Sequence, residues 1–130
     1  MITRFGHITL LVRDQTEALR FYTDILGMEK RADMTMENGF RWLTVAPKGE
    51  KLEIVFVQAD TPDKLARVGS QVADHVFLVM HTDDCRKDAA RLQARGVKFL
   101  SQPTEQPYGI EAVFQDLYGN VMDLLQPRAM

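Results

Sequence analysis

An internal repeat with a spacing of 70 residues constrains this chain more than any other feature. In the first half, His7 opens an apolar run, Asp14 follows that run, and Glu53 lies inside a later apolar run. The positions 70 residues further on are Phe77, Asp84 and Asp123. They lie in the same kinds of segment as their counterparts, so we interpret the chain as two copies of one module. One of the repeated polar positions is occupied by a phenylalanine.

The first copy has the pattern of a strand, a helix and three strands. Residues 7–12 are apolar on both faces of an extended chain and predict a buried strand. Asp14, with Glu17 three residues later, predicts the start of a helix, and Gly27 predicts its end. Turn compositions then separate three further predicted strands. These strands are Met28–Met36, Gly39–Pro47 and Lys51–Val57.

The second copy has the same βαβββ pattern. His75–Met80 predicts a buried strand, Asp83 or Asp84 predicts the cap of a helix, and Gly96 predicts the end of that helix. The three strands expected after the helix are Val97–Leu100, Gly109–Gln115 and Asn120–Gln126. We therefore expect one domain over residues 1–130, with module 1 at about 1–57, a connector at 58–74 that can include a short helix, and module 2 at about 75–130.

Composition excludes several classes of function. A chain of 130 residues with 45% apolar content can bury one shared core. The net charge of −2, with Lys and Arg scattered among Asp and Glu, argues against a nucleic-acid partner. No apolar stretch approaches the roughly 20 residues of a membrane span, and no signal segment is recognisable. With Cys85 as the single cysteine, we expect a cytoplasmic protein without an internal disulfide.

Several motifs together resemble those of a known family. They are Gly6 to Asp14, the helix end Phe21 to Met28, the run Leu92 to Val97, and the late segment Asp116 to Leu124. With them the chain resembles the vicinal oxygen chelate superfamily, which includes glyoxalase I, bleomycin-resistance proteins, fosfomycin-resistance transferases and extradiol dioxygenases. The resemblance implies an α+β fold in which the two βαβββ modules form a cupped eight-strand half-barrel sheet with the helices outside. It also implies a homodimer. It does not define a reaction, because this fold carries several chemistries.

The resemblance also implies where a metal ion would bind. Metal enzymes of this kind hold ligands on the first and fourth strand of each module, which here gives His7, Glu53, Phe77 and Asp123. Imidazole and carboxylate ligands suit a divalent ion such as Zn²⁺, Ni²⁺, Fe²⁺ or Mn²⁺. Phe77 cannot coordinate an ion, and His75, two residues earlier, is the nearest replacement. A single histidine at a strand start is more often a packing or capping residue than a ligand.

Two functions remain open. One is a glyoxalase- and bleomycin-resistance-like protein that binds a small molecule in the sheet cleft and keeps a degenerate or weak metal site. The alternative is a metal-dependent glyoxalase-type lyase or isomerase in which the ion polarises vicinal substrate oxygens and Glu53 or Asp123 carries a proton. Phe77 favours the first, and the aligned His7, Glu53 and Asp123 favour the second. The aromatic residues that could line a ligand pocket are Phe40, Trp42, Phe77 and Tyr108, although packing is the ordinary role of aromatic residues in strands.

Overall fold

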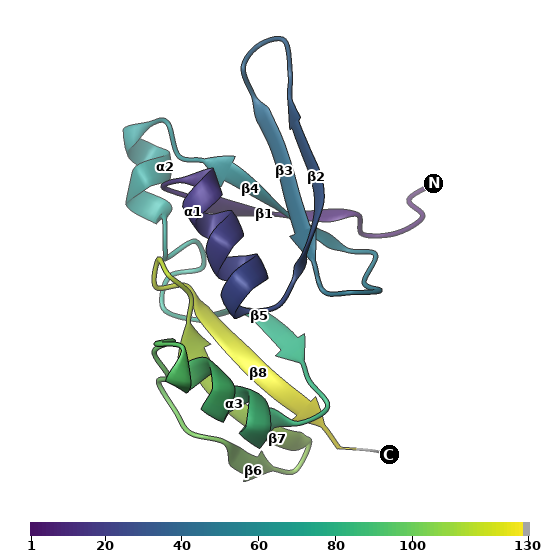
Figure 1. Ribbon diagram of the computed structural model, residues 1–130, viewed down its shortest axis with the longest axis vertical. Helices are drawn as coiled ribbons and strands as arrows, with labels where there is room; N and C mark the ends of the chain where they lie inside the picture. The colour runs from purple at the N-terminus through teal and green to yellow at the C-terminus, as the bar shows by residue number, and fades with distance from the viewer. Residues whose placement is uncertain (129–130) are drawn as a thin grey trace. The chain divides into compact units, whose positions relative to one another are not determined.

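The strands of the protein lie in two separate four-stranded sheets, each with its own helix (Figure 1). The structure is a computed structural model that describes residues 1–128. It divides into unit 1, Met1–Val68, and unit 2, Gly69–Met130. This boundary falls inside the predicted connector. The α+β class and the two βαβββ modules are confirmed, whereas the grouping of both units into one domain stays a prediction.

Unit 1 follows the predicted order of elements closely. Its strands are β1 (His7–Val12), β2 (Glu29–Thr35), β3 (Arg41–Ala46) and β4 (Glu53–Gln58). The sheet order is β1-β4-β3-β2, with β1 parallel to β4 and the other neighbours antiparallel. A short helix, α2 (Pro62–Arg67), follows β4 within the predicted connector and is capped by Thr61. Over residues 1–128, no helix is long and apolar enough to cross a membrane.

The helix of unit 1 begins and ends where the sequence predicts. The Asp14 side chain accepts a hydrogen bond from the Glu17 backbone N–H at the start of α1 (Gln15–Arg20). The helix continues as a π-helical turn, η1 (Phe21–Ile25), which the sequence pattern does not reveal. After it, Gly27 adopts the positive φ of 83° that favours glycine. Buried Tyr22 packs against Phe56 of β4, with ring centroids 5.2 Å apart, so this helix covers one face of the sheet.

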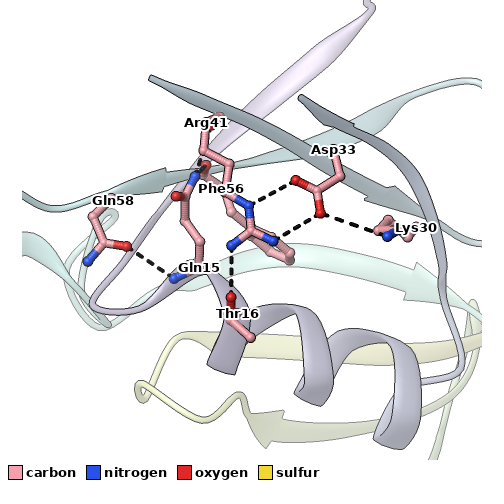
Figure 2. A network of polar contacts seen from close by, with 7 residues as sticks. All are labelled: Gln15, Thr16, Lys30, Asp33, Arg41, Phe56 and Gln58. Atoms are coloured by element: carbon pink, nitrogen blue, oxygen red, sulfur yellow. Dashed lines mark hydrogen bonds and ion pairs between the residues drawn. The ribbon is translucent and has the colours of Figure 1, made fainter. Parts of the chain in front are cut away.

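A polar network attaches the start of this helix to the hairpin of β2 and β3 (Figure 2). The side-chain amide of Gln15 donates to the backbone oxygens of Arg41 and Phe56, at 3.0 and 2.9 Å. The guanidinium of Arg41 donates twice to Asp33, at 2.9 and 3.0 Å, and once to the hydroxyl of Thr16 at 2.8 Å. A bidentate pair of this kind fixes both side chains, so Arg41 has a structural role here.

Unit 2 repeats the architecture with one difference from the prediction. Its elements are β5 (Val76–His81), α3 (Cys85–Ala94), β6 (Thr104–Gln106), β7 (Gly109–Gln115) and β8 (Val121–Pro127). The sheet order is β5-β8-β7-β6. The strand predicted at Val97–Leu100 is wrong, because this segment makes only an isolated bridge from Phe99 to Phe114. The Leu100 and Ser101 N–H groups both donate to the Val113 oxygen, so the ladder does not continue until β6.

The start of α3 matches the start of α1 in detail. Asp84, rather than Asp83, caps α3 by accepting from the Lys87 N–H at 3.0 Å. In both units a glutamine side chain from the end of the fourth strand accepts a hydrogen bond from the first helical N–H. These contacts are Gln58 to Gln15 at 3.1 Å and Gln126 to Cys85 at 3.0 Å. The two glutamines are therefore structurally equivalent positions of the duplication.

This equivalence corrects the spacing of the carboxylates in the repeat. Glu53 lies five residues before Gln58, whereas Asp123 lies three residues before Gln126. Glu53 and Asp123 therefore occupy different rows of their sheets, although the sequence offset matches them. The helix caps keep the 70-residue spacing, and the fourth strands do not.

Candidate functional site

His7 and Glu53 form a close polar pair on unit 1. They are opposite each other on the parallel strands β1 and β4. The His7 Nε2 atom lies 3.5 Å from Glu53 Oε1, and the two side chains are 43% and 23% exposed. The pair lies on the sheet face opposite to Phe56 and the helix, because side chains alternate along each strand. The predicted proximity of these two residues is thus found within one unit.

Trp42 lies on the same face as this pair. Its indole meets the His7 ring edge-on, with centroids 5.1 Å apart and an interplanar angle of 68°. Thr44, two residues along β3, is fully buried, and its hydroxyl has no hydrogen-bond partner among the described residues. Phe40, just before β3, keeps an exposed ring. We call the surface formed by His7, Trp42, Thr44 and Glu53 the Trp42 face.

Arg31 also lies on the Trp42 face, at an irregularity in β2. The pairing of β2 with β3 shifts between Lys30 and Ala32, which leaves Arg31 as an extra residue in a bulge. Its Nη2 donates to the Pro47 oxygen at 2.7 Å, and its Nη1 lies 4.0 Å from Glu53 Oε2. Its Nε lies 3.4 Å from Glu29 Oε1. Glu53 is therefore held between an imidazole and a guanidinium.

Unit 2 holds a second polar cluster, built from Asp123, Glu111 and Tyr108. Glu111 of β7 and Asp123 of β8 share a sheet face, since Asp123 is opposite Val113 and Glu111 is opposite Leu125. The Tyr108 hydroxyl donates to Glu111 Oε1. Burial, followed by the hydrogen bond and the negative charge of Glu111, raises the pKa of Asp123 from 3.8 to about 7. Asp123 Oδ1 is buried and has no hydrogen-bond partner among the described residues.

The register of β5 corrects the expected place of Phe77. The strand has a shift between Val76 and Leu78, so Phe77 is an extra residue and Val79 lies opposite Asp123. His75 precedes β5, is exposed, and has its Nδ1 3.3 Å from the Val76 oxygen. Cys85 is buried, and this burial, with the Asp123 charge, raises the pKa of its thiol.

The fit of a divalent ion can be judged from the donors in each unit. Within either unit, over residues 1–128, no three His, Cys, Asp or Glu side chains group as a metal site. The distance of 3.5 Å between His7 Nε2 and Glu53 Oε1 is nevertheless close to the edge, about 3.4 Å, of a tetrahedron with arms of about 2.1 Å. The guanidinium of Arg31 beside Glu53 opposes a cation there. Unit 1 thus has two suitable donors in surroundings that do not fit a tightly held ion.

Two of these residues were not predicted from the sequence. Arg31 gave no recognisable signal, because its contact with Glu53 depends on how β2, β3 and β4 pair. Glu111 did give a sequence signal. In the predicted strand it shares a face with Val113 and Gln115, which places a carboxylate beside an apolar residue. Tyr108 was expected to line a pocket, and the structure shows it bound to Glu111.

The fold agrees with comparisons to known proteins. The sequence model of the Glyoxalase/Bleomycin resistance protein/Dioxygenase superfamily matches residues 4–124. A protein of Shewanella frigidimarina is 41% identical over 122 residues, which cover 92% of this chain and 90% of that protein. The chain belongs to this superfamily.

Two solved structures are similar over nearly the whole chain. The crystal structure of UcmS2 has a TM-score of 0.84 and 36% identity, covering 96% of this chain and 98% of the other. TnmS3, an antibiotic binding protein from Streptomyces sp. CB03234, has a TM-score of 0.82 and 38% identity, covering 98% of both chains. The resemblance to the vicinal oxygen chelate superfamily is thereby confirmed.

Proposed function

We propose that this protein binds a small organic molecule on the Trp42 face and does so without a tightly held metal ion. The observation that carries the proposal is the combination on one sheet face of an indole, an imidazole and a carboxylate that already has Arg31 beside it. Such a surface offers an aromatic plane for stacking and a few polar groups for orientation, as ligand sites generally do. Phe40 remains a proposed lining residue of this face, and Phe77 and Tyr108 remain proposed lining residues within unit 2.

The similar structures support a binding role. TnmS3 is an antibiotic binding protein, and it shares 38% of aligned residues with this chain. We therefore propose an antibiotic-like aromatic compound as the class of ligand. A degenerate metal site is consistent with this role, because binding and sequestration require no polarised substrate.

Fluorescence offers a direct test, because Trp42 is the single tryptophan of the chain. We expect at least one compound in a panel of bleomycin and aromatic antibiotics to change the Trp42 emission saturably, with a dissociation constant of about 1 μM or lower, which corresponds to about −8 kcal/mol. Calorimetry should show that Trp42→Ala weakens binding at least tenfold. Phe5→Ala is the matched control, since Phe5 is an exposed aromatic residue of the N-terminal segment. Equal binding by both variants would contradict the proposed surface.

A glyoxalase-type lyase or isomerase is the second candidate, and Asp123 favours it. A carboxyl group with a pKa of about 7 can both accept and donate a proton near neutral pH, as a general acid or base must. Isomerisation of a hemithioacetal substrate that is lost in Asp123→Asn and retained in Asp83→Asn would support this candidate. Absence of turnover in the wild type, with or without added Zn²⁺ or Ni²⁺, would exclude it for that substrate.

We also propose that the protein is a cytoplasmic homodimer. A sheet edge and an apolar face left open within one chain are commonly covered by a second subunit. Light scattering at tens of micromolar should return twice the chain mass of 14.8 kDa. A monomer mass would reject the dimer.

A further inference from the structure

We infer that Arg31 determines the metal preference of unit 1 by keeping the His7–Glu53 pair from holding a divalent cation. Its guanidinium supplies, from within the chain, the positive charge that a bound ion would give to Glu53. The inference deepens the proposed function and rests on it, since that function needs no tightly held metal.

Arg31 lies on this face next to a bulge in β2. Lys30 pairs with Val45 and Ala32 pairs with Thr44, so two successive residues of β3 face three residues of β2. The extra residue is Arg31, and its contacts with Pro47, Glu29 and Glu53 show that its side chain reaches the Trp42 face. Glu29 pairs with Ala46, which shares its strand face with Trp42 and Thr44, so alternation from Glu29 sets Arg31 on the Trp42 face. The bulge then places Ala32 on this face as well, opposite Thr44.

Ala46 leaves room for the guanidinium. The β3–β4 register pairs Val45 with Ile54, so one further step places Ala46 opposite Glu53. On the other side of β3, Ala46 pairs with Glu29. A methyl side chain between the two carboxylates allows Arg31, held at 2.7 Å from the Pro47 oxygen, to lie between Glu29 and Glu53. The side chain of Arg31 is only 23% exposed, so water screens its charge incompletely.

An ion bound to Glu53 would meet this charge at short range. A divalent metal lies about 2.0–2.2 Å from a carboxylate oxygen. The oxygen that faces His7 is Oε1, and Arg31 Nη1 lies 4.0 Å from the other oxygen, Oε2, so an ion shared by His7 and Glu53 would lie within about 8 Å of the guanidinium. Like charges at this distance repel strongly in partly buried surroundings. The His7–Glu53 spacing itself suits two ligands of one ion, so Arg31 is the element that opposes binding.

The experiment measures the affinity for Zn²⁺ alone, by calorimetry, on protein freed of any histidine tag. We expect Arg31→Met to bind Zn²⁺ at least tenfold more tightly than the wild type, because Glu53 and Glu29 lose their shared cation while His7 stays in place. Arg31→Gln, which keeps an N–H for the Pro47 oxygen, should show the same gain and provides a second variant if Arg31→Met unfolds. Arg31→Lys, which keeps the charge, should bind as weakly as the wild type.

Two further variants separate this effect from a general change of charge. Lys30→Met removes a neighbouring cation that pairs with Asp33, not with Glu53 (Figure 2), and should leave Zn²⁺ affinity unchanged. His7→Ala combined with Arg31→Met should abolish the gain. The inference is overturned if Arg31→Met and Arg31→Gln bind no better than the wild type, if Lys30→Met gains as much, or if the wild type already binds Zn²⁺ tightly through His7. Ligand binding by the wild type, read from Trp42 fluorescence, tests the proposed function separately.

Discussion

Replacing Asp123 by Asn should change how the stability of the protein depends on pH. In the folded protein the pKa of Asp123 is raised from 3.8 to about 7, first by burial and then by Glu111. The folded state therefore holds this proton more tightly than the unfolded state. The resulting stabilisation is complete below about pH 4 and is lost as the pH rises through 7. Asn cannot ionise, so the Asp123→Asn variant has no such stabilisation to lose as the pH rises.

The size of the effect follows from the difference in pKa. The interval between 3.8 and about 7 corresponds to at most about 4 kcal/mol, at about 1.4 kcal/mol for each tenfold change. Asp123 is only partly buried and shares its proton with Glu111, so solvent screening and coupling reduce this value. We expect the free energy of unfolding of Asp123→Asn, relative to the wild type, to rise by about 1–2 kcal/mol between pH 4.5 and pH 8.

Urea unfolding at pH 4.5, 6, 7 and 8 measures this difference directly. Asp83→Asn is the matched control, because Asp83 is an exposed carboxylate one residue before the N-cap of α3, and it should not reproduce the change expected for Asp123→Asn. Glu111→Gln should reproduce part of the effect by removing the negative neighbour of Asp123. A stability difference for Asp123→Asn that does not vary between pH 4.5 and 8 would refute the shared-proton interpretation.

Three other predictions concern the backbone and the strand register. Gly69→Ala should lower the free energy of unfolding by about 2 kcal/mol or more, because φ is +83° and the added Cβ would lie 2.0 Å from the Tyr118 backbone oxygen. Gly39→Ala, with φ +86° and open space around the Cβ, should lower it by about 1 kcal/mol. Equal shifts in the melting temperature of the two variants would contradict this prediction. Asp84→Ala removes the N-cap of α3 and should lower the free energy of unfolding, measured with urea, by about 1 kcal/mol. Asp83→Ala should lower it by less than about 0.5 kcal/mol. Val79→His should lower the pKa of Asp123 in a carbon-detected NMR titration, because residue 79 lies opposite Asp123 as His7 lies opposite Glu53. Phe77→His, which changes the extra residue of the bulge, should lower the pKa of Asp123 less than Val79→His does. A larger decrease with Phe77→His would show that this strand register is wrong.

The features that the sequence predicts correctly are those determined by neighbouring residues. Asp14 and Asp84 cap helices because their carboxylates reach an N–H three residues later, and this contact depends on local spacing alone. Gly27 follows the first helix with positive φ for an equally local reason. The strands near 7–12, 41–46, 53–58 and 121–127 follow from apolar runs bounded by turns. Together with the repeat, these elements were sufficient for the fold class.

The features that the sequence does not predict depend on strand pairing. A bulge adds one residue without any characteristic residue type, so neither Arg31 in β2 nor Phe77 in β5 is recognisable as the extra residue. The segment 97–100 has the composition of a strand, but two of its N–H groups compete for the Val113 oxygen. The 70-residue offset in the sequence therefore matched Glu53 with Asp123. The equivalent glutamines Gln58 and Gln126 show instead that the fourth strands of the two units are offset by two residues fewer.

The polar clusters of the two units differ in the group that neutralises the carboxylate. In unit 1 the bulge lies in β2, the pairing of His7 with Glu53 is regular, and the guanidinium of Arg31 lies beside Glu53. In unit 2 the bulge lies in β5, so the residue opposite the carboxylate is Val79, and Asp123 instead finds Glu111 on its other neighbouring strand. One carboxylate is therefore neutralised by an arginine and the other by a shared proton. Both clusters therefore balance the charge of a half-buried carboxylate from within the chain, as burial requires.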